Sequence, residues 1–167
     1  MKSARKGKAD KPPPAERRSP DRTQWAAQFA VASELCKRDC QVAFTLGNNP
    51  TADLMAISPK GVPFTVDVKG LYKKNFWPVR PKKAKPNLFY ILALVLDEEQ
   101  SRVPNQAQNR FFILTQDQAN EAIEAEEALA RTRAVDRGRS VDNIGNFPGI
   151  TWGQAEASEN AWDILPK

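Results

Sequence analysis

Asp53, Asp67 and Lys69 lie in a stretch of strand-like residues, ADLMAISPKGVPFTVDVKG, at positions 52–70. A three-residue hairpin loop at 59–61, with Gly61 left-handed, would place Asp53 opposite Asp67, with their β-carbons roughly 4.5–5.5 Å apart. Lys69 then shares the face of Asp67, because side chains alternate along a strand. Facing carboxylates repel each other unless a cation lies between them. Since oxygen ligands favour Mg²⁺ or Mn²⁺, we expect such an ion between Asp53 and Asp67.

The register of this hairpin decides whether the site exists. A two-residue loop would put the two acids on opposite faces. Asp53 would then be a turn residue, and Asp67 would form an exposed ion pair with Lys69 that contributes little to stability. The residues of the hairpin are compatible with both interpretations.

The chain contains no histidine. This excludes Ser-His-Asp and Cys-His nucleophile systems, and it excludes zinc sites and nucleases that depend on imidazole. Any chemistry must therefore use carboxylates, lysines, hydroxyl groups and a bound metal ion.

A basic segment overlaps the second half of the hairpin and continues beyond it. From Lys60 to Lys85 the chain has eight basic residues and one acid, Asp67, with aromatic residues interleaved. Cations beside planar side chains suit a nucleic-acid backbone and unstacked bases; the alternative is a solvated loop. The residues predicted to bind nucleic acid are Lys60, Lys73, Lys74, Trp77, Arg80, Lys82, Lys83 and Lys85.

The rest of the charge is concentrated at the amino terminus. Residues 1–22 hold eight basic and three acidic residues, which equals the net charge of +5, and they are rich in proline. We expect this segment to be disordered, as a nonspecific phosphate-binding arm or a solubilising leader. Residues 23–167 are long enough for a single domain with a real core.

Cysteine usage and hydropathy indicate a reduced, cytoplasmic protein. Cys36 and Cys40 are four residues apart, which suits one helix face and provides no disulfide framework. We expect both to be small buried hydrophobic residues. No apolar run reaches the length of a membrane span, and no signal-peptide pattern is present.

A helix, five strands and a second helix are predicted in that order. The first helix covers 23–38, with Thr23 as its cap and Trp25, Phe29, Ala32 and Cys36 as its buried stripe. Glu34 lies within this apolar helix, where a carboxylate needs a partner. The expected strands are 41–47, 52–58, 62–69, 88–96 and 110–115, and 70–87 is expected to be a loop. The second helix starts at Thr115 or Asp117 and runs to about Arg131, with Ala122, Ile123, Ala125 and Leu129 inward. The fold class is α/β, a mixed sheet flanked by helices.

The combination of Glu34, the Gly-Asn-Asn-Pro turn at 47–50, Asp53 and Asp67-Val68-Lys69 resembles the PD-(D/E)XK nuclease superfamily. That group includes restriction endonucleases and archaeal Holliday-junction resolvases, and the resemblance covers roughly 23–115. It implies a restriction endonuclease-like core and a metal-dependent endonuclease acting on nucleic acid, with DNA as the expected substrate. Enzymes of this group often pair to cut two strands, so a homodimer is a further expectation.

The resemblance also assigns roles to residues. Asp53 and Asp67 would bind Mg²⁺ or Mn²⁺, the Val68 carbonyl would be a third ligand, and Glu34 would reach the metal directly or through water. Lys69 would position the attacking water. The chain departs from the family pattern with Asp67 where many members have Glu, and with Thr51-Ala52 before the first acid. Alternative functions are a noncatalytic nucleic-acid-binding module of the same fold and a structural protein with surface ion pairs.

Overall fold

The computed structural model describes residues 19–45, 52–103, 108–140 and 148–167. The amino-terminal segment 1–18 and the predicted turn at 47–50 lie outside the described residues. The chain forms a five-stranded sheet in the order β1-β2-β3-β5-β6, in which β3 and β5 are parallel and the other neighbours antiparallel. The predicted fold class, a mixed sheet flanked by helices, is confirmed.

The first helix and the sheet strands lie close to their predicted positions. They are α1 (Pro20–Cys36), β1 (Gln41–Phe44), β2 (Leu54–Ile57), β3 (Pro63–Leu71), β5 (Leu88–Leu94) and β6 (Arg110–Thr115). The long helix α3 (Gln116–Asp136) follows β6 directly. The sequence did not predict α2 (Glu98–Ser101) or the small sheet of β4 (Trp77–Pro78) and β7 (Gly149–Ile150). The chain ends in α4 (Trp152–Ala155) and two short 3₁₀ helices, η2 (Glu156–Ser158) and η3 (Trp162–Ile164).

The hairpin between β2 and β3 has the predicted register. Gly61 is left-handed, with φ of 84°, and Leu54 pairs with Val66 while Ile57 pairs with Pro63. The regular pairing extends back only to Leu54, so Asp53, the residue before it, is not paired. The three-residue loop therefore sets the register of the strands, but the ladder does not extend to the two acids.

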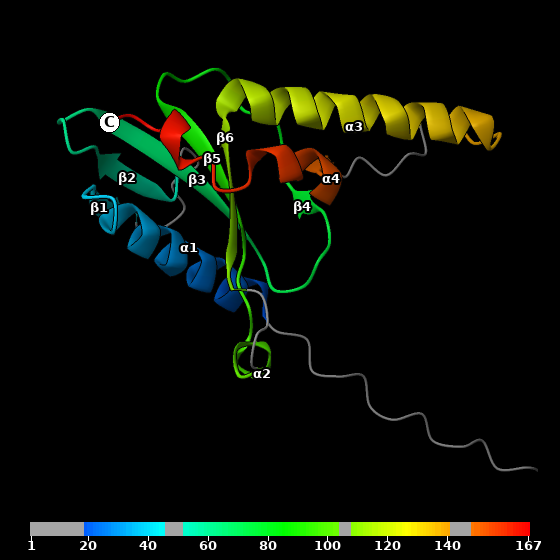
Figure 1. Ribbon diagram of the computed structural model, residues 1–167. Coiled ribbons are helices and arrows are strands. Elements are labelled where there is room, and N and C mark those ends of the chain that lie inside the picture. Colours follow the sequence, from blue (N-terminus) through cyan, green and yellow to red (C-terminus); the bar gives the residue numbers. More distant parts are fainter. Residues whose placement is uncertain (1–18, 46–51, 104–107, 141–147) are drawn as a thin grey trace, which may run out of the picture.

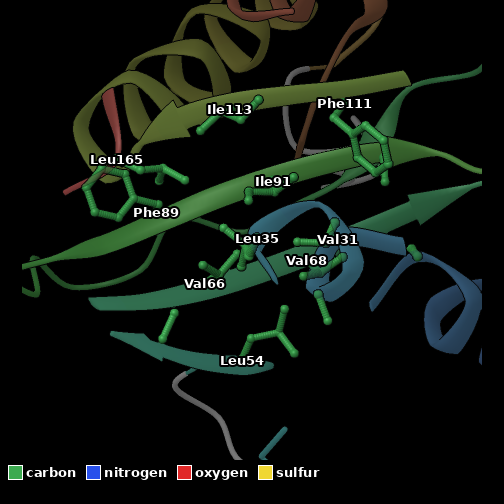
Figure 2. Packing of buried hydrophobic residues seen from close by; sticks show 14 of the residues in the cluster. Val31, Leu35, Leu54, Val66, Val68, Phe89, Ile91, Phe111, Ile113 and Leu165 are labelled. Carbon is green, nitrogen blue, oxygen red and sulfur yellow. The ribbon is translucent and has the colours of Figure 1, made fainter. Parts of the chain in front are cut away.

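Each face of the sheet carries its own hydrophobic core. One core, shown close up in Figure 2, packs Val31 and Leu35 of α1 against alternate residues of the strands, among them Val66, Val68 and Ile91. The opposite core joins the other strand residues to β4, β7, α3 and α4. In Figure 1, α1 lies on one side of the sheet, and α3, α4 and β4 lie on the other. Asp67 and Lys69 alternate with Val66 and Val68, so they face the second side.

The orientation of α1 differs from the prediction. Trp25 and Phe29 are 44% and 59% exposed, and Cys36 is also exposed, so the predicted stripe is wrong except for Ala32. The buried residues are Thr23, Ala27, Gln28, Val31, Ala32 and Leu35. The cause is a close approach: a β-carbon on Gly70 of β3 would lie 2.7 Å from Ala27 Cβ. The missing side chain of Gly70 therefore makes room for this side of the helix against the sheet.

The ends of α1 also differ from the prediction. The helix begins at Pro20 with Ser19 in the N-cap position, so residues 20–22, predicted to be disordered, are helical. Thr23 is not a cap; its hydroxyl donates to the carbonyl of Ser19. Cys40 lies beyond the helix and is half-buried, so the prediction of two buried cysteines on one helix face is wrong.

The helix α3 is longer than predicted. Thr115 caps it, forming a reciprocal pair of hydrogen bonds with Gln118, and the helix continues to Asp136. Ile123 is buried as predicted, whereas Ala125 and Leu129 are exposed. Figure 1 shows why: much of α3 extends beyond the sheet. None of the described helices is long and apolar enough to cross a membrane.

Candidate functional site

Asp67 is the centre of the candidate site. It lies in the middle of β3, beside Tyr90 of β5, and only 2% of its side chain is exposed. Lys69 Nζ lies 2.6 Å from Asp67 Oδ1, and the ammonium of Lys82 forms an ion pair with Oδ2. The predicted pairing of Asp67 with Lys69 is therefore present, but the carboxylate is buried and has two lysine partners.

A hollow of about 420 Å³ opens beside this carboxylate. Among the described residues that line it, Asp67 is the only acid, whereas Lys69, Arg80 and Lys82 contribute three cations. Pro78, Val79 and Pro148 complete the lining, so one wall comes from β4 and the segment that leads into β7. The hollow therefore has a net positive charge and suits an anion.

Asp53 lies near Asp67 but does not face it. Its backbone N–H donates to Val66 O at 2.9 Å, although Val66 is already the strand partner of Leu54. Asp53 therefore does not continue the regular pairing toward Asp67. Ala52 contributes to the second core and Leu54 to the first, although residues two apart in a regular strand share a face. The chain therefore turns at Asp53, and the prediction that both acids point from one face is wrong.

The carboxylate of Asp53 lies at the edge of β3. Its Oδ2 accepts a hydrogen bond from Val68 N at 2.7 Å, and its Oδ1 accepts one from Gln28 Nε2 at 2.9 Å. Burial raises the pKa of Asp53, and the charge of Asp67 adds to this effect, while the hydrogen bond from Val68 N opposes it. The two acids are thus close enough to interact electrostatically.

Gln24 of α1 continues the hydrogen bonding along the same edge. Its Nε2 donates to Val68 O at 2.7 Å, and its Oε1 accepts from Gly70 N at 3.3 Å. β3 continues past Val66, where its pairing with β2 stops at Leu54. Along this unpaired length of β3, the side-chain amide of Gln24 takes the place of a peptide group of β2. Gln24 and Gln28 were not predicted as site residues. The available signal was their spacing, because glutamines four residues apart on an alanine-rich helix share one helix face.

Glu34 is not part of this group. Its carboxylate pairs with Lys37 Nζ at 2.7 Å and with Arg38 Nη1 at 2.8 Å, and these hydrogen bonds lower its pKa. Glu34 follows Gln28 by six residues, which is about 9 Å along the axis and about 120° around the helix. The structure therefore does not bring Glu34 to Asp53; Lys37 and Arg38, which directly follow α1, neutralise its charge.

The basic segment contains both exposed and buried side chains. Trp77 is completely buried, with its ring stacked 5.1 Å from Trp152, so the predicted contact between Trp77 and bases is wrong. Lys82 is partly buried against Asp67. The exposed members of the predicted set are Lys60, Lys73, Lys74, Arg80, Lys83 and Lys85. Their exposure is compatible with nucleic-acid contacts and equally with a solvated surface.

Gln116, the first residue of α3, holds the backbone of this segment. Its Nε2 donates to the carbonyls of Lys82 and Lys83, and its Oε1 accepts from Lys85 N at 2.7 Å. Asn120 adds a hydrogen bond from Nδ2 to Lys82 O at 3.3 Å. The predicted loop 70–87 therefore has its later part fixed beside the carboxylate of Asp67. Gln116 is a second buried glutamine that the sequence analysis missed.

The donor atoms at the site fit a hard divalent cation, although with few ligands. Within the described part of the chain, the buried Asp67 Oδ1 accepts no hydrogen bond of good geometry, although Lys69 Nζ is close. One or two carboxylates, completed by water and substrate phosphate, are a usual set for Mg²⁺. The Val68 carbonyl already accepts from Gln24. Among the described residues, no three histidine, cysteine or acidic side chains are grouped to hold a metal.

Comparisons with known proteins leave the family open. No protein-family model matches the chain, and no curated protein matches it. A solved structure of a bacterial homing endonuclease, I-Ssp6803I, aligns with 59% of this chain and 67% of its own, at 20% identity and a TM-score of 0.44. At these values the likeness assigns neither a family nor an activity.

Proposed function

We propose that the protein is a metal-dependent endonuclease of the PD-(D/E)XK type that hydrolyses phosphodiester bonds in DNA. The observation that carries the proposal is the buried Asp67 with Lys69 beside it, at a hollow lined by three cations. A phosphodiester is an anion, and its hydrolysis needs charge stabilisation and an oriented water molecule. The hollow supplies the positive charge, and Asp67 supplies the acid.

Asp67 and Asp53 would together hold a Mg²⁺ or Mn²⁺ ion. Such an ion, when bound, lowers the pKa of a water molecule and stabilises charge on a phosphoryl oxygen. Gln28 and Val68 N fix the carboxylate of Asp53. The Val68 carbonyl remains a proposed third ligand that would share its lone pairs with Gln24.

Lys69 has a role that needs no metal. Its ammonium lies at the border between Asp67 and the hollow, where it can donate to a phosphate oxygen or to the attacking water. Arg80 lines the same hollow and would bind a neighbouring phosphate oxygen. The exposed lysines of the basic segment would bind the nucleic-acid backbone through charge alone, so this part of the binding is expected to weaken with salt.

A noncatalytic nucleic-acid-binding module is the second candidate. Two lysines already neutralise Asp67, and Glu34 does not join the acids. These observations favour a site that binds phosphate without cleaving it. Cleavage in the presence of a divalent cation separates the two candidates.

The test is a nuclease assay on the full chain with Mg²⁺, with Mn²⁺ and with a chelator. The substrates are supercoiled plasmid, single-stranded DNA, branched DNA and an RNA. We expect metal-dependent cutting of DNA by the wild type, and loss of cutting in Lys69→Ala and in Asp67→Asn. Glu34→Gln is the matched control, because it removes a carboxylate on α1 that does not reach the site, and it should cut normally.

The outcomes separate the candidates clearly. Normal cutting by Lys69→Ala and Asp67→Asn would remove the proposed active site. No cutting by any protein, with salt-dependent DNA binding that Lys69→Ala weakens, would identify the noncatalytic module instead.

A further inference from the structure

Lys82 occupies one oxygen of the carboxylate that is proposed to bind a metal ion. Its ammonium pairs with Oδ2, while Lys69 pairs with Oδ1, so each oxygen of the buried carboxylate has one positive partner. A buried acid needs such compensation, because a charge out of water is costly when unpaired. In this arrangement Lys82 supplies half of the positive charge that a divalent ion would bring.

The two lysines differ in how they are anchored. Lys69 lies on β3 together with Asp67, so the strand itself brings the two residues together. Lys82 comes from the segment after β4, and its backbone carbonyl accepts hydrogen bonds from Gln116 and Asn120 at 3.1 and 3.3 Å. The chain therefore fixes the backbone of Lys82 while leaving a long side chain to span the distance to Asp67. The side chain of Lys82 is 31% exposed, so it has solvent to move into.

We propose that Lys82 is a built-in counter-ion of Asp67 which a divalent cation must displace from the carboxylate. The inference rests on the proposed function for the identity of that cation. Lys82 lowers the affinity of the site for metal, because binding breaks its ion pair and brings two positive groups close together. The displaced ammonium remains at the hollow beside Arg80, where a phosphate group provides its new partner. Metal and phosphate therefore favour each other's binding.

The test measures Mn²⁺ binding to the full chain by calorimetry, without nucleic acid. Lys82→Met keeps the apolar stem and removes the charge, and it should bind Mn²⁺ roughly 10- to 100-fold more tightly than the wild type. Lys83→Met is the matched control, since Lys83 is the next residue, is exposed, and is also held at its carbonyl by Gln116. It should bind Mn²⁺ like the wild type, and Asp67→Asn should not bind it.

Thermal unfolding provides a second readout that does not depend on catalysis. In chelator, Lys82→Met should unfold at a lower temperature than Lys83→Met, because Asp67 has lost one of its two partners. Added Mn²⁺ should stabilise Lys82→Met more than the wild type. If Lys82→Met does not fold, Lys82→Gln replaces it, because glutamine can still donate a hydrogen bond to Asp67 without carrying a charge.

The outcomes distinguish this proposal from the proposed function. Unchanged or weaker Mn²⁺ binding by folded Lys82→Met, beside normal cutting by the wild type, overturns the role of Lys82 and leaves the nuclease intact. Tighter binding by Lys82→Met without cutting by any protein supports Lys82 as the counter-ion and removes the nuclease. No Mn²⁺ binding by any folded variant overturns the counter-ion proposal.

Discussion

The loss of stability caused by replacing Gln24 can be predicted in detail from the structure. Replacing it with alanine removes the hydrogen bonds to Val68 O and from Gly70 N, while the contact with Asp53 Oδ2 at 3.5 Å is too long to count for much. Two hydrogen bonds at about 0.5–1.5 kcal/mol each give an expected loss of about 1–3 kcal/mol. For a chain of this size the unfolding temperature should fall by roughly 3–10 °C.

A comparison with Gln24→Glu makes the assay more specific. In Gln24→Glu a carboxylate would face the Val68 carbonyl and the acid of Asp53, so at neutral pH the loss should be at least as large as in Gln24→Ala. Its pKa would be raised in the folded state, so stability should be regained as the pH falls through that raised pKa. A protonated glutamate can donate to Val68 O, whereas alanine cannot.

The measurement is urea unfolding in chelator, from neutral pH down to about pH 4, for the wild type and both variants. Ser33→Ala, exposed on the same helix, is the control and should stay within about 0.5 kcal/mol of the wild type. The reasoning is refuted if Gln24→Ala behaves like this control. It is also refuted if Gln24→Glu and Gln24→Ala show the same pH dependence.

Three further predictions concern the surroundings of the site. Burial, helped by Asp67, raises the pKa of Asp53 above its ordinary value of 3.8. Its protonation therefore stabilises the fold at low pH, and this stabilisation is lost as the pH rises through the raised pKa. Asp53→Asn should thus gain stability relative to the wild type at neutral pH, and the gain should shrink as the pH falls toward 3.8; a constant difference in urea unfolding would contradict this. Gln116→Ala should speed trypsin cleavage after Lys82 and Lys83 several-fold, because the carbonyls of both residues lose a hydrogen-bond donor. Equal cleavage rates in Gln116→Ala and the wild type would show that other contacts hold the segment. Tyr90→Phe removes a buried hydroxyl that has no hydrogen-bond partner among the described residues. The unfolding free energy of this variant should therefore lie between that of the wild type and about 1 kcal/mol above it, and a clear loss of stability would reveal a partner for the hydroxyl.

The hairpin was predictable because its cause is local. Gly61 and the lengths of the two apolar runs determine the loop, and the loop determines the pairing of Leu54 with Val66. The spacing of Asp67 and Lys69 on one strand then fixes their contact. These features needed no information from distant parts of the chain.

The orientation of α1 was not predictable in the same way. The helix carries apolar residues on every side, so its pattern does not select the buried face. Tertiary contacts decide it: Ala27 lies against Gly70, and Gln24 and Gln28 bind the edge of β3 and Asp53. Once that face is set, Glu34 is directed away from the acids.

The predicted contact between Trp77 and nucleic-acid bases was wrong for a related reason. In the sequence it stands among lysines and prolines and resembles an exposed recognition residue. Its burial depends on two residues much later in the chain: Ile150, which pairs with it across the small sheet, and Trp152, whose ring stacks on it. The composition around Trp77 does not indicate partners that lie more than 70 residues away in the sequence.

The amide of Gln24 and the carboxylate of Asp53 also bear on self-association of the protein. An uncovered length of strand can recruit a strand from another molecule and start aggregation. Where β3 has no pairing with β2, these side chains form hydrogen bonds with Val68 N, Val68 O and Gly70 N. At the far side of the sheet, Asn160 N donates to Phe111 O of β6. Side chains and a returning loop thus block strand addition at these positions, and Gln24→Ala should aggregate on heating more readily than its loss of stability alone would explain.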